Sequence, residues 1–234
     1  MYTKTDAFDI LFDMELYKSP LGVRGLSGLK TIKIAVLCVL AVLMNLLLSS
    51  FVMNFLRFPL FLDTVFTAAI AFAFGLIPGI ITAFFTWFLP CAFYSGFNFY
   101  VLCSFAEVFL ICTIKSSAVN IPDFSQREWT AASKEKITAS YTALVSKLFL
   151  LYVLCAITIS VLGGVVDYVT HLFIERHYFS VDDIFKHGLF MNNLPIMAVN
   201  VLSRIPVNIV DRFIVIFGGY FVSRGLVKFF KNSA

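Results

Sequence analysis

The residues best suited to chemistry lie at helical spacing within an apolar stretch near the C-terminus. They are Asn200, Arg204, Asn208, Asp211 and Arg212. The offsets from Asn200 are 4, 8, 11 and 12, so at about 100° per residue these side chains share one side of a helix. Guanidinium, carboxylate and amide groups together could line a cavity for a ligand of mixed charge. The alternative is internal compensation, Arg204 with Asp211 or Arg212 with Asp211, without a ligand. Pro206 lies inside the stripe and is expected to kink the helix.

A second ionisable side chain, Glu107, also lies within an apolar stretch. Tyr100 and Cys103 precede it by seven and four positions, which places the three on one helical face. Glu107 could pair with an arginine of the C-terminal stripe or bind the cationic group of a ligand. Tyr100 could belong to an interfacial aromatic belt or stack on a flat ligand.

Arg57 and Asp63 flank a short segment between two apolar stretches. Either charge could contact a ligand, or simply lie at the membrane interface. Asp63-Thr64 also resembles a helix N-cap.

The elements that must position these residues are membrane helices. Of the 234 residues, 60% are hydrophobic and 14% are charged, against about 45–50% and about 25% in soluble domains. A soluble core of this size could not bury so much apolar surface, whereas a bilayer can solvate it. The five cysteines lie in or beside apolar runs without a C-x-x-C motif, which favours buried apolar side chains over a metal or redox site.

Charge-free runs of about 20 residues indicate spanning helices. We expect an all-α, six-transmembrane-helix bundle that forms a single membrane domain over residues 1–234. The expected helices cover 34–56, 62–75, 78–93, 99–114, 148–166 and 195–223. A break is expected at the Gly75–Gly79 segment, because Gly and Pro favour a turn there.

The distribution of Lys and Arg predicts the orientation of this bundle. Basic residues are concentrated in the N-terminal flank, in 116–147 and at the C-terminus. The 91–98 loop has none, and the two basic residues of 167–187 are offset by acids. Both termini and a 116–143 loop are therefore expected in the cytoplasm, with a 167–187 loop outside. The residues before the first run do not resemble a signal peptide.

Several function classes are disfavoured. The longest polar segment has about 30 residues, too few to build a catalytic core alone. No P-loop, H-E-x-x-H, G-x-S-x-G or EF-hand pattern occurs. A net charge of +4 does not suggest nucleic acid. We therefore expect a protein that is not an enzyme and that needs no cofactor or metal.

Two segments carry a family resemblance. The first reads FLDTVFTAA at 61–69 and closes on GLIPGIITA at 75–83, and the second reads RIPVNIVDR at 204–212. They resemble the substrate-binding S components of energy-coupling factor (ECF) transporters, whose relatives form the membrane regions of some sensor kinases. The resemblance covers about residues 30–225. It implies a multi-pass protein of the bacterial cell membrane that captures a vitamin or similar micronutrient. Its partners would be membrane lipid, a transmembrane coupling protein and two ATPase subunits.

Carried over position by position, the resemblance selects a substrate site in the outer half of the bundle. That site comprises Arg57, Asp63, Asn98, Tyr100, Glu107, Asn200, Arg204, Asn208, Asp211 and Arg212. One alternative is a membrane sensor or signalling module without its own catalytic domain. Another is a membrane scaffold without a ligand.

Overall fold

The computed structural model describes residues 28–56, 60–95, 98–115, 131–173, 186, 189 and 194–232. Within these residues the protein is helical and contains no strand. The elements in chain order are α3 Gly28–Ser50, η1 Phe51–Leu56, α4 Val65–Phe74, α5 Leu76–Pro90, η2 Cys91–Ser95, α6 Val101–Lys115, α7 Ala131–Phe173 and α9 Ile196–Asn232. Here η1 and η2 are π-helical ends of α3 and α5. The predicted all-helical class is confirmed for the described part of the chain.

Four helices of the described structure are long and apolar enough to cross a membrane. The candidate spans are Thr31–Phe55, Leu76–Phe93, Thr138–Thr170 and Ile196–Phe229. Two further helices occupy predicted ranges but are shorter, α4 with 10 residues and α6 with 15. A lone helix needs about 20 residues to span a bilayer. By length and composition, these helices are compatible with a multi-pass membrane protein.

The short helix α4 is the centre of the bundle. It packs against α3, α5, α6 and α9, and eight of its ten residues are buried. Its alanines allow close approach, which small residues provide in membrane bundles. A Cβ at Gly219 of α9 would lie 2.9 Å from Ala68 Cβ, and one at Gly79 of α5 would lie 3.1 Å from Ala71 Cβ.

Helices α4 and α5 meet at Gly75. Its φ of 93° is a left-handed conformation that glycine adopts without steric cost. Of the predicted Gly75–Gly79 break, only Gly75 separates the two helices. Pro78 and Gly79 already belong to the first turn of α5. Proline is tolerated there because the first-turn N–H groups have no partner within the helix.

Both predicted loops are partly wrong, because α7 extends into each of them. This helix has 43 residues and so extends about 65 Å, which takes in positions 131–143 and 167–173 of the expected loops. The first of these stretches is rich in Ala, Lys and Glu, which continue a helix into water as readily as leucine does within lipid. The rest of the predicted loops lies outside the described residues, apart from Lys186.

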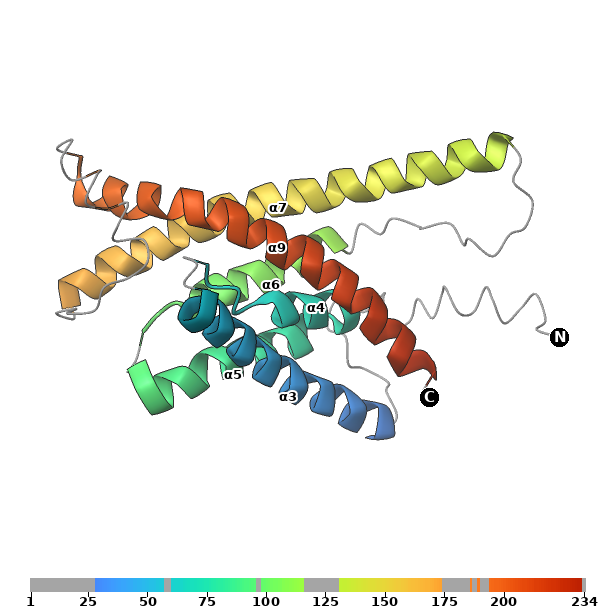
Figure 1. Cartoon of the computed structure of the whole chain (residues 1–234), viewed down its shortest axis with the longest axis horizontal. Helices are drawn as coiled ribbons and strands as arrows, with labels where there is room; N and C mark the ends of the chain where they lie inside the picture. Colours follow the sequence, from blue (N-terminus) through green and yellow to red (C-terminus); the bar gives the residue numbers. More distant parts are fainter. Residues whose placement is uncertain are drawn as a thin grey trace.

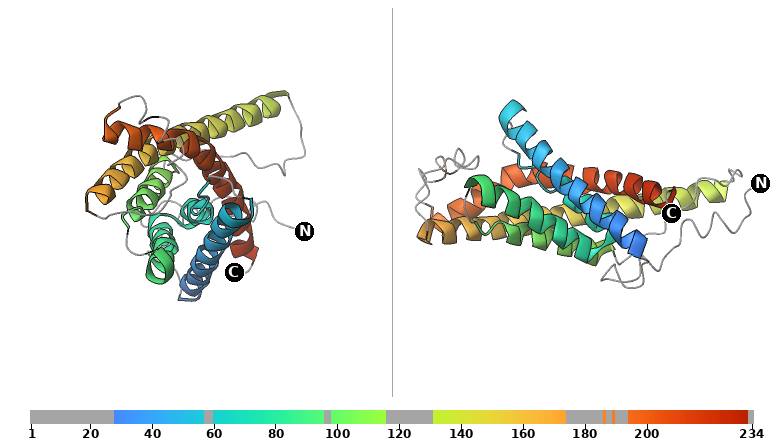
Figure 2. Two further views of the ribbon diagram at one scale, coloured as in Figure 1. Left: turned by 60° about the vertical axis from the view of Figure 1, so that its left-hand side comes forward. Right: turned by 90° about the horizontal axis from the view of Figure 1, so that it is seen from below.

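Helices α7 and α9 cross at close range, and α3 to α6 gather beside them (Figures 1 and 2). A Cβ at Gly164 of α7 would lie 2.8 Å from the Cα of Val201 in α9. Helix α9 continues through Pro206 and changes direction along its length (Figure 1).

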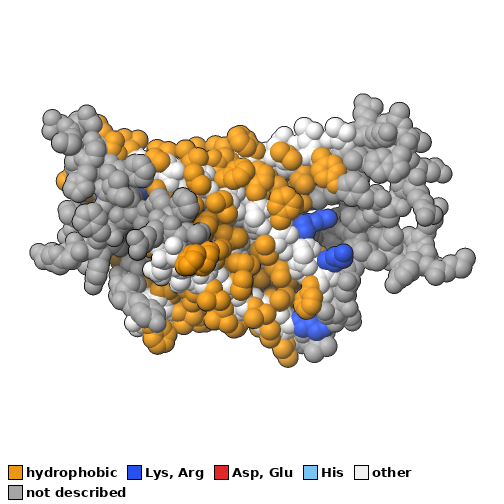
Figure 3. All heavy atoms as spheres, viewed as in Figure 1, with side chains coloured by type: hydrophobic (Ala, Val, Ile, Leu, Met, Phe, Trp, Pro, Cys, Tyr) orange, Lys and Arg blue, Asp and Glu red, His pale blue; other side chains and the backbone are white. Residues whose placement is uncertain are grey.

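The two ends of the bundle differ. Helices α3 and α7 begin, and α6 and α9 end, at the right of Figure 1, whereas α7 ends and α9 begins at the left. Figure 3 shows basic side chains towards the right-hand end, beside a broad apolar band. Many large apolar side chains are exposed, among them Phe93, Phe221 and Phe229. Exposure on this scale fits a surface covered by lipid.

Candidate functional site

The polar stripe of α9 faces the interior. Asn200, Arg204, Asn208, Asp211 and Arg212 are all buried, at 5%, 6%, 3%, 0% and 4% exposure. The apolar residues between them, such as Leu202, Ile205 and Ile209, are exposed. The prediction that these five polar side chains share one helix side is confirmed.

Arg204 of α9 belongs to a buried cluster with a residue of α7, the residue before α6, and Lys186. We name Tyr100, Asp167, Lys186 and Arg204 the Arg204 cluster. Arg204 Nε donates to Asp167 Oδ2 of α7 at 2.9 Å, and Arg204 Nη2 donates to the Tyr100 hydroxyl at 2.7 Å. That hydroxyl donates in turn to Asp167 Oδ1. Lys186 Nζ lies 3.2 Å from Asp167 Oδ2.

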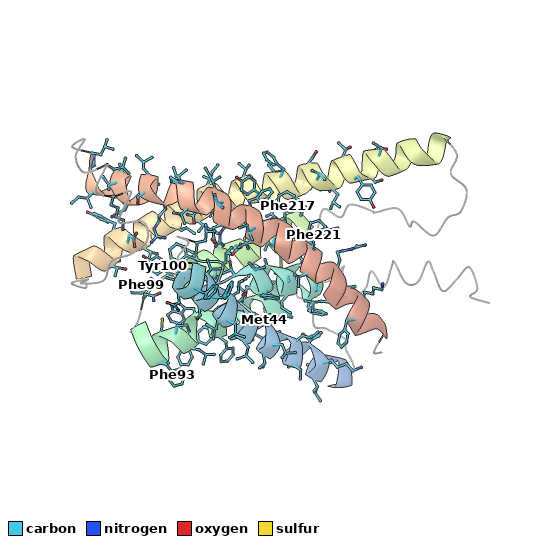
Figure 4. All side chains as sticks on the ribbon, in the orientation of Figure 1. Met44, Phe93, Phe99, Tyr100, Phe217 and Phe221 are labelled. Carbon is cyan, nitrogen blue, oxygen red and sulfur yellow. The ribbon has the colours of Figure 1, made fainter. Side chains whose placement is uncertain are left out.

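Small and polar neighbours position this cluster. A Cβ at Gly163 of α7 would lie 2.9 Å from Arg204 Nη1, so a larger residue there would displace the guanidinium. Asn98 Oδ1 accepts from Tyr100 N at 3.2 Å and from Trp87 Nε1 at 2.8 Å. Asn98 thus fixes the start of α6 and, with it, Tyr100, which Figure 4 labels.

Arg212 forms a second cluster deeper in the bundle. We name Thr64, Glu107, Asp211 and Arg212 the Arg212 cluster. Arg212 Nη1 donates to Glu107 Oε2 at 2.6 Å and to Thr64 Oγ1 at 3.0 Å. Arg212 Nε donates to Asp211 Oδ2 at 3.1 Å, and Nη2 contacts the same oxygen. Eight positions, or about 12 Å of helix, separate the two arginines along α9.

Asp211 also holds the backbone before α4. Its Oδ1 accepts a hydrogen bond from Leu62 N at 2.9 Å. Leu62 has a φ of 39°, a left-handed conformation that is uncommon for a residue with a branched side chain. The carboxylate therefore compensates for local backbone strain and links α9 to the turn that leads into α4.

The structure distinguishes between the internal ion pairs that the sequence left open. Arg212 pairs with Asp211, and Glu107 pairs with an arginine of α9, both as expected. The alternative pairing of Arg204 with Asp211 is wrong. These residues lie about two helical turns apart, and α7 places Asp167 against Arg204 instead.

The first predicted loop needs a further correction. Arg57 lies outside the described residues. Thr64 occupies the N-cap position of α4, but within the described structure no side-chain hydrogen bond caps the helix from there. Asn45 of α3 replaces it, because its Oδ1 accepts from Phe66 N at 2.9 Å.

Asp63 is half-buried beside the Arg212 cluster. Its carboxyl interacts electrostatically with both Arg212 and Asp211.

Sequence reasoning missed several residues of this interior. The charge pattern predicts a loop around Asp167 and Lys186 and only a cap at Thr64. It gives no role to Asn45, which is fully buried and donates to Thr67 Oγ1 at 2.9 Å and Thr86 Oγ1 at 3.3 Å. A polar residue inside a charge-free apolar run was the available signal.

The remaining stripe residues contribute packing and hydrogen bonding. Asn208 Nδ2 donates to Ser160 Oγ of α7 at 3.0 Å, and Asn200 is buried near the start of α9. The stripe therefore connects α9 to α6, α7 and the start of α4 by directional polar contacts. Comparison of the chain with protein-family models, with curated proteins and with solved structures finds no match.

Proposed function

We propose that this protein is the substrate-capture membrane subunit of an ECF-type importer, which takes up a vitamin or similar small micronutrient. The observation that carries the proposal is the Arg204 cluster. Charged groups of α7 and α9 and the hydroxyl of Tyr100, just before α6, converge there, towards the end of the bundle where α7 ends and α9 begins. Ionisable groups within membrane bundles typically mark substrate pathways.

The Arg204 cluster is better placed than the Arg212 cluster for first contact with a ligand. Tyr100 is half-buried and the Lys186 side chain is 14% exposed, whereas Glu107 and Asp211 are 0% exposed. A carboxylate, a phenol and two cationic groups suit a ligand with both acidic and hydrogen-bonding groups. In the proposal, Arg204, Tyr100 and Asn200 contact the ligand from this end, and the remaining predicted site residues support them.

The proposal includes six membrane crossings in the bacterial plasma membrane, with both termini in the cytoplasm. The short α4 supplies about 15 Å, and non-helical residues 60–64 add up to about 16 Å, which together approach the bilayer core of about 30 Å. Leu62 and Thr64 of this stretch are buried in protein, as irregular backbone at membrane depth must be. Expected partners are the coupling protein and its two ATPase subunits.

The test is mass spectrometry of small molecules released from the purified protein, followed by thermal unfolding with each candidate. A bound micronutrient should raise Tm in the wild type. Tyr100→Phe, which removes only a hydroxyl group, should weaken this rise when Tm is compared with and without ligand in the same variant. Arg204→Ala should abolish the rise, whereas Arg224→Ala, at an exposed base of the same helix, should not. If no vitamin or precursor co-purifies or raises Tm, the proposal fails.

One observation favours the sensor alternative. The N-terminal part of α7 continues well beyond the about 30 Å of a bilayer core, on the side where α9 ends. Such an extension could contact a separate signalling protein. Co-purification with a kinase, without an ATPase pair, would support this second function.

A further inference from the structure

One atom of the Arg212 cluster has no hydrogen-bond partner. Among the residues that the structure describes, Glu107 Oε1 is the buried side-chain oxygen or nitrogen left unsatisfied. Glu107 is 0% exposed, and its other oxygen accepts from Arg212. An ionised carboxylate would leave this oxygen charged and unsolvated in the membrane interior, which is far more costly than an unpaired neutral group.

The balance of charges within the cluster also favours a neutral Glu107. Arg212 is its single cation, whereas Glu107 and Asp211 supply two carboxylates. Asp211 is the better anion, because both of its oxygens are satisfied, one by Arg212 and the other by Leu62 N. If Glu107 were also ionised, the Arg212 cluster would carry a net negative charge.

The surroundings of Glu107 offer no second cation in the described structure. Asp63 precedes α4 and adds another acid, and the thiols of Cys103 in α6 and Cys155 in α7 pack into the same core. Helices α4 and α5 contain no titratable residue. The described residues include no group of three His, Cys, Asp or Glu that could hold a metal ion.

We propose that the Arg212 cluster is a proton-binding site, and that Glu107 carries the proton at neutral pH. With this proton bound, the carboxyl of Glu107 is neutral. Arg212 and Asp211 then form an ion pair without net charge. This role does not depend on a micronutrient, because every group of the site belongs to the chain.

The test is infrared spectroscopy of the purified full chain in lipid nanodiscs at neutral pH, with glutamate labelled by ¹³C. The wild type should show the carbonyl band of a protonated carboxylic acid, shifted by the label and absent from Glu107→Gln. In Asp211→Asn the band should disappear, because Arg212 then has Glu107 as its remaining counter-charge. Replacing potassium by sodium should leave the band in place.

Thermal unfolding gives a second readout from a matched pair of variants. Glu107→Gln resembles the protonated acid and should unfold close to the wild type. Asp211→Asn makes the same chemical change at the other carboxylate that contacts the Arg212 guanidinium and should lower Tm strongly. The proposal is overturned if the wild type lacks a labelled protonated-acid band, if sodium removes the band, or if Glu107→Gln destabilises the protein as much as Asp211→Asn. Because absence of the band from the wild type is enough to overturn the proposal, the test does not depend on whether the variants fold.

Discussion

Arg204 Nε lies 2.9 Å from Asp167 Oδ2, and this ion pair joins α9 to α7 inside the bundle. The side chains are 7% and 4% exposed, and the Tyr100 hydroxyl contacts both. The guanidinium also lies over the Tyr100 ring, 4.9 Å from its centroid. Because a buried charge without its partner is costly, the two residues should behave as a unit.

The first prediction concerns this pair. Asp167→Leu alone should lower the free energy of unfolding by about 3–5 kcal/mol, since it leaves Arg204 without its buried counter-charge. Arg204→Met alone should cost less, because Asp167 still pairs with Lys186. The double variant should lose less than Asp167→Leu alone, because it also removes the uncompensated guanidinium. Unfolding in detergent followed by circular dichroism provides the measurement. Additive losses would show that the two side chains are not coupled.

The second prediction concerns Asn45, whose amide joins α3 to α4 and α5. Asn45→Leu should destabilise the protein by about 1–3 kcal/mol, because the buried Phe66 N–H loses its acceptor. Asn54→Leu, at an exposed position of η1, is the matched control and should change stability little. Equal effects of the two substitutions would contradict the assigned role of Asn45. Thermal unfolding monitored by intrinsic fluorescence measures both.

How far the interior could be predicted depended on whether the signal was local. The inward side of α9 was predictable, because the spacing of Asn200, Arg204 and Asp211 sets their common face by helix geometry alone. The partner of Arg204 was not, because it depends on α7 lying against α9, a contact between distant parts of the chain. Asp167 follows a charge-free run and resembled a loop residue, but the ion pair keeps it inside the bundle.

The helix bounds likewise divide into features with a local sequence signal and features without one. The charge-free runs predicted where helices lie, whereas their ends depended on features that hydropathy does not report. Helix α4 begins at Val65 because Leu62 N before it bonds to Asp211, and Asn45 accepts from the first-turn N–H of Phe66. Helix α7 begins at Ala131 because good helix formers extend it beyond the apolar run.

The third prediction concerns the contact between α9 and α4. Gly219→Ala would place a Cβ 2.9 Å from Ala68 Cβ and 3.0 Å from the Val65 carbonyl oxygen, so the helices must separate. The expected loss is about 1–3 kcal/mol, typical of overpacking. Gly225→Ala, on the same helix, meets nothing within 4 Å in the described structure and should be neutral or slightly stabilising. Comparing Tm for the two variants tests the packing, and a loss at Gly225 as large as at Gly219 would contradict it.

The fourth prediction concerns the orientation of the bundle in the membrane. In a variant without the native cysteines, single cysteines would replace Thr138 near the start of α7, Lys228 near the end of α9, and Met197 near its beginning, all exposed positions. Thr138→Cys and Lys228→Cys should be protected from a membrane-impermeant maleimide in intact cells and react after lysis, because the basic end of the bundle should face the cytoplasm. Met197→Cys should react in intact cells, since α9 crosses the bilayer between positions 197 and 228. Labelling of Thr138→Cys and Lys228→Cys from opposite sides would exclude the antiparallel crossing of α7 and α9 that positions both ion clusters.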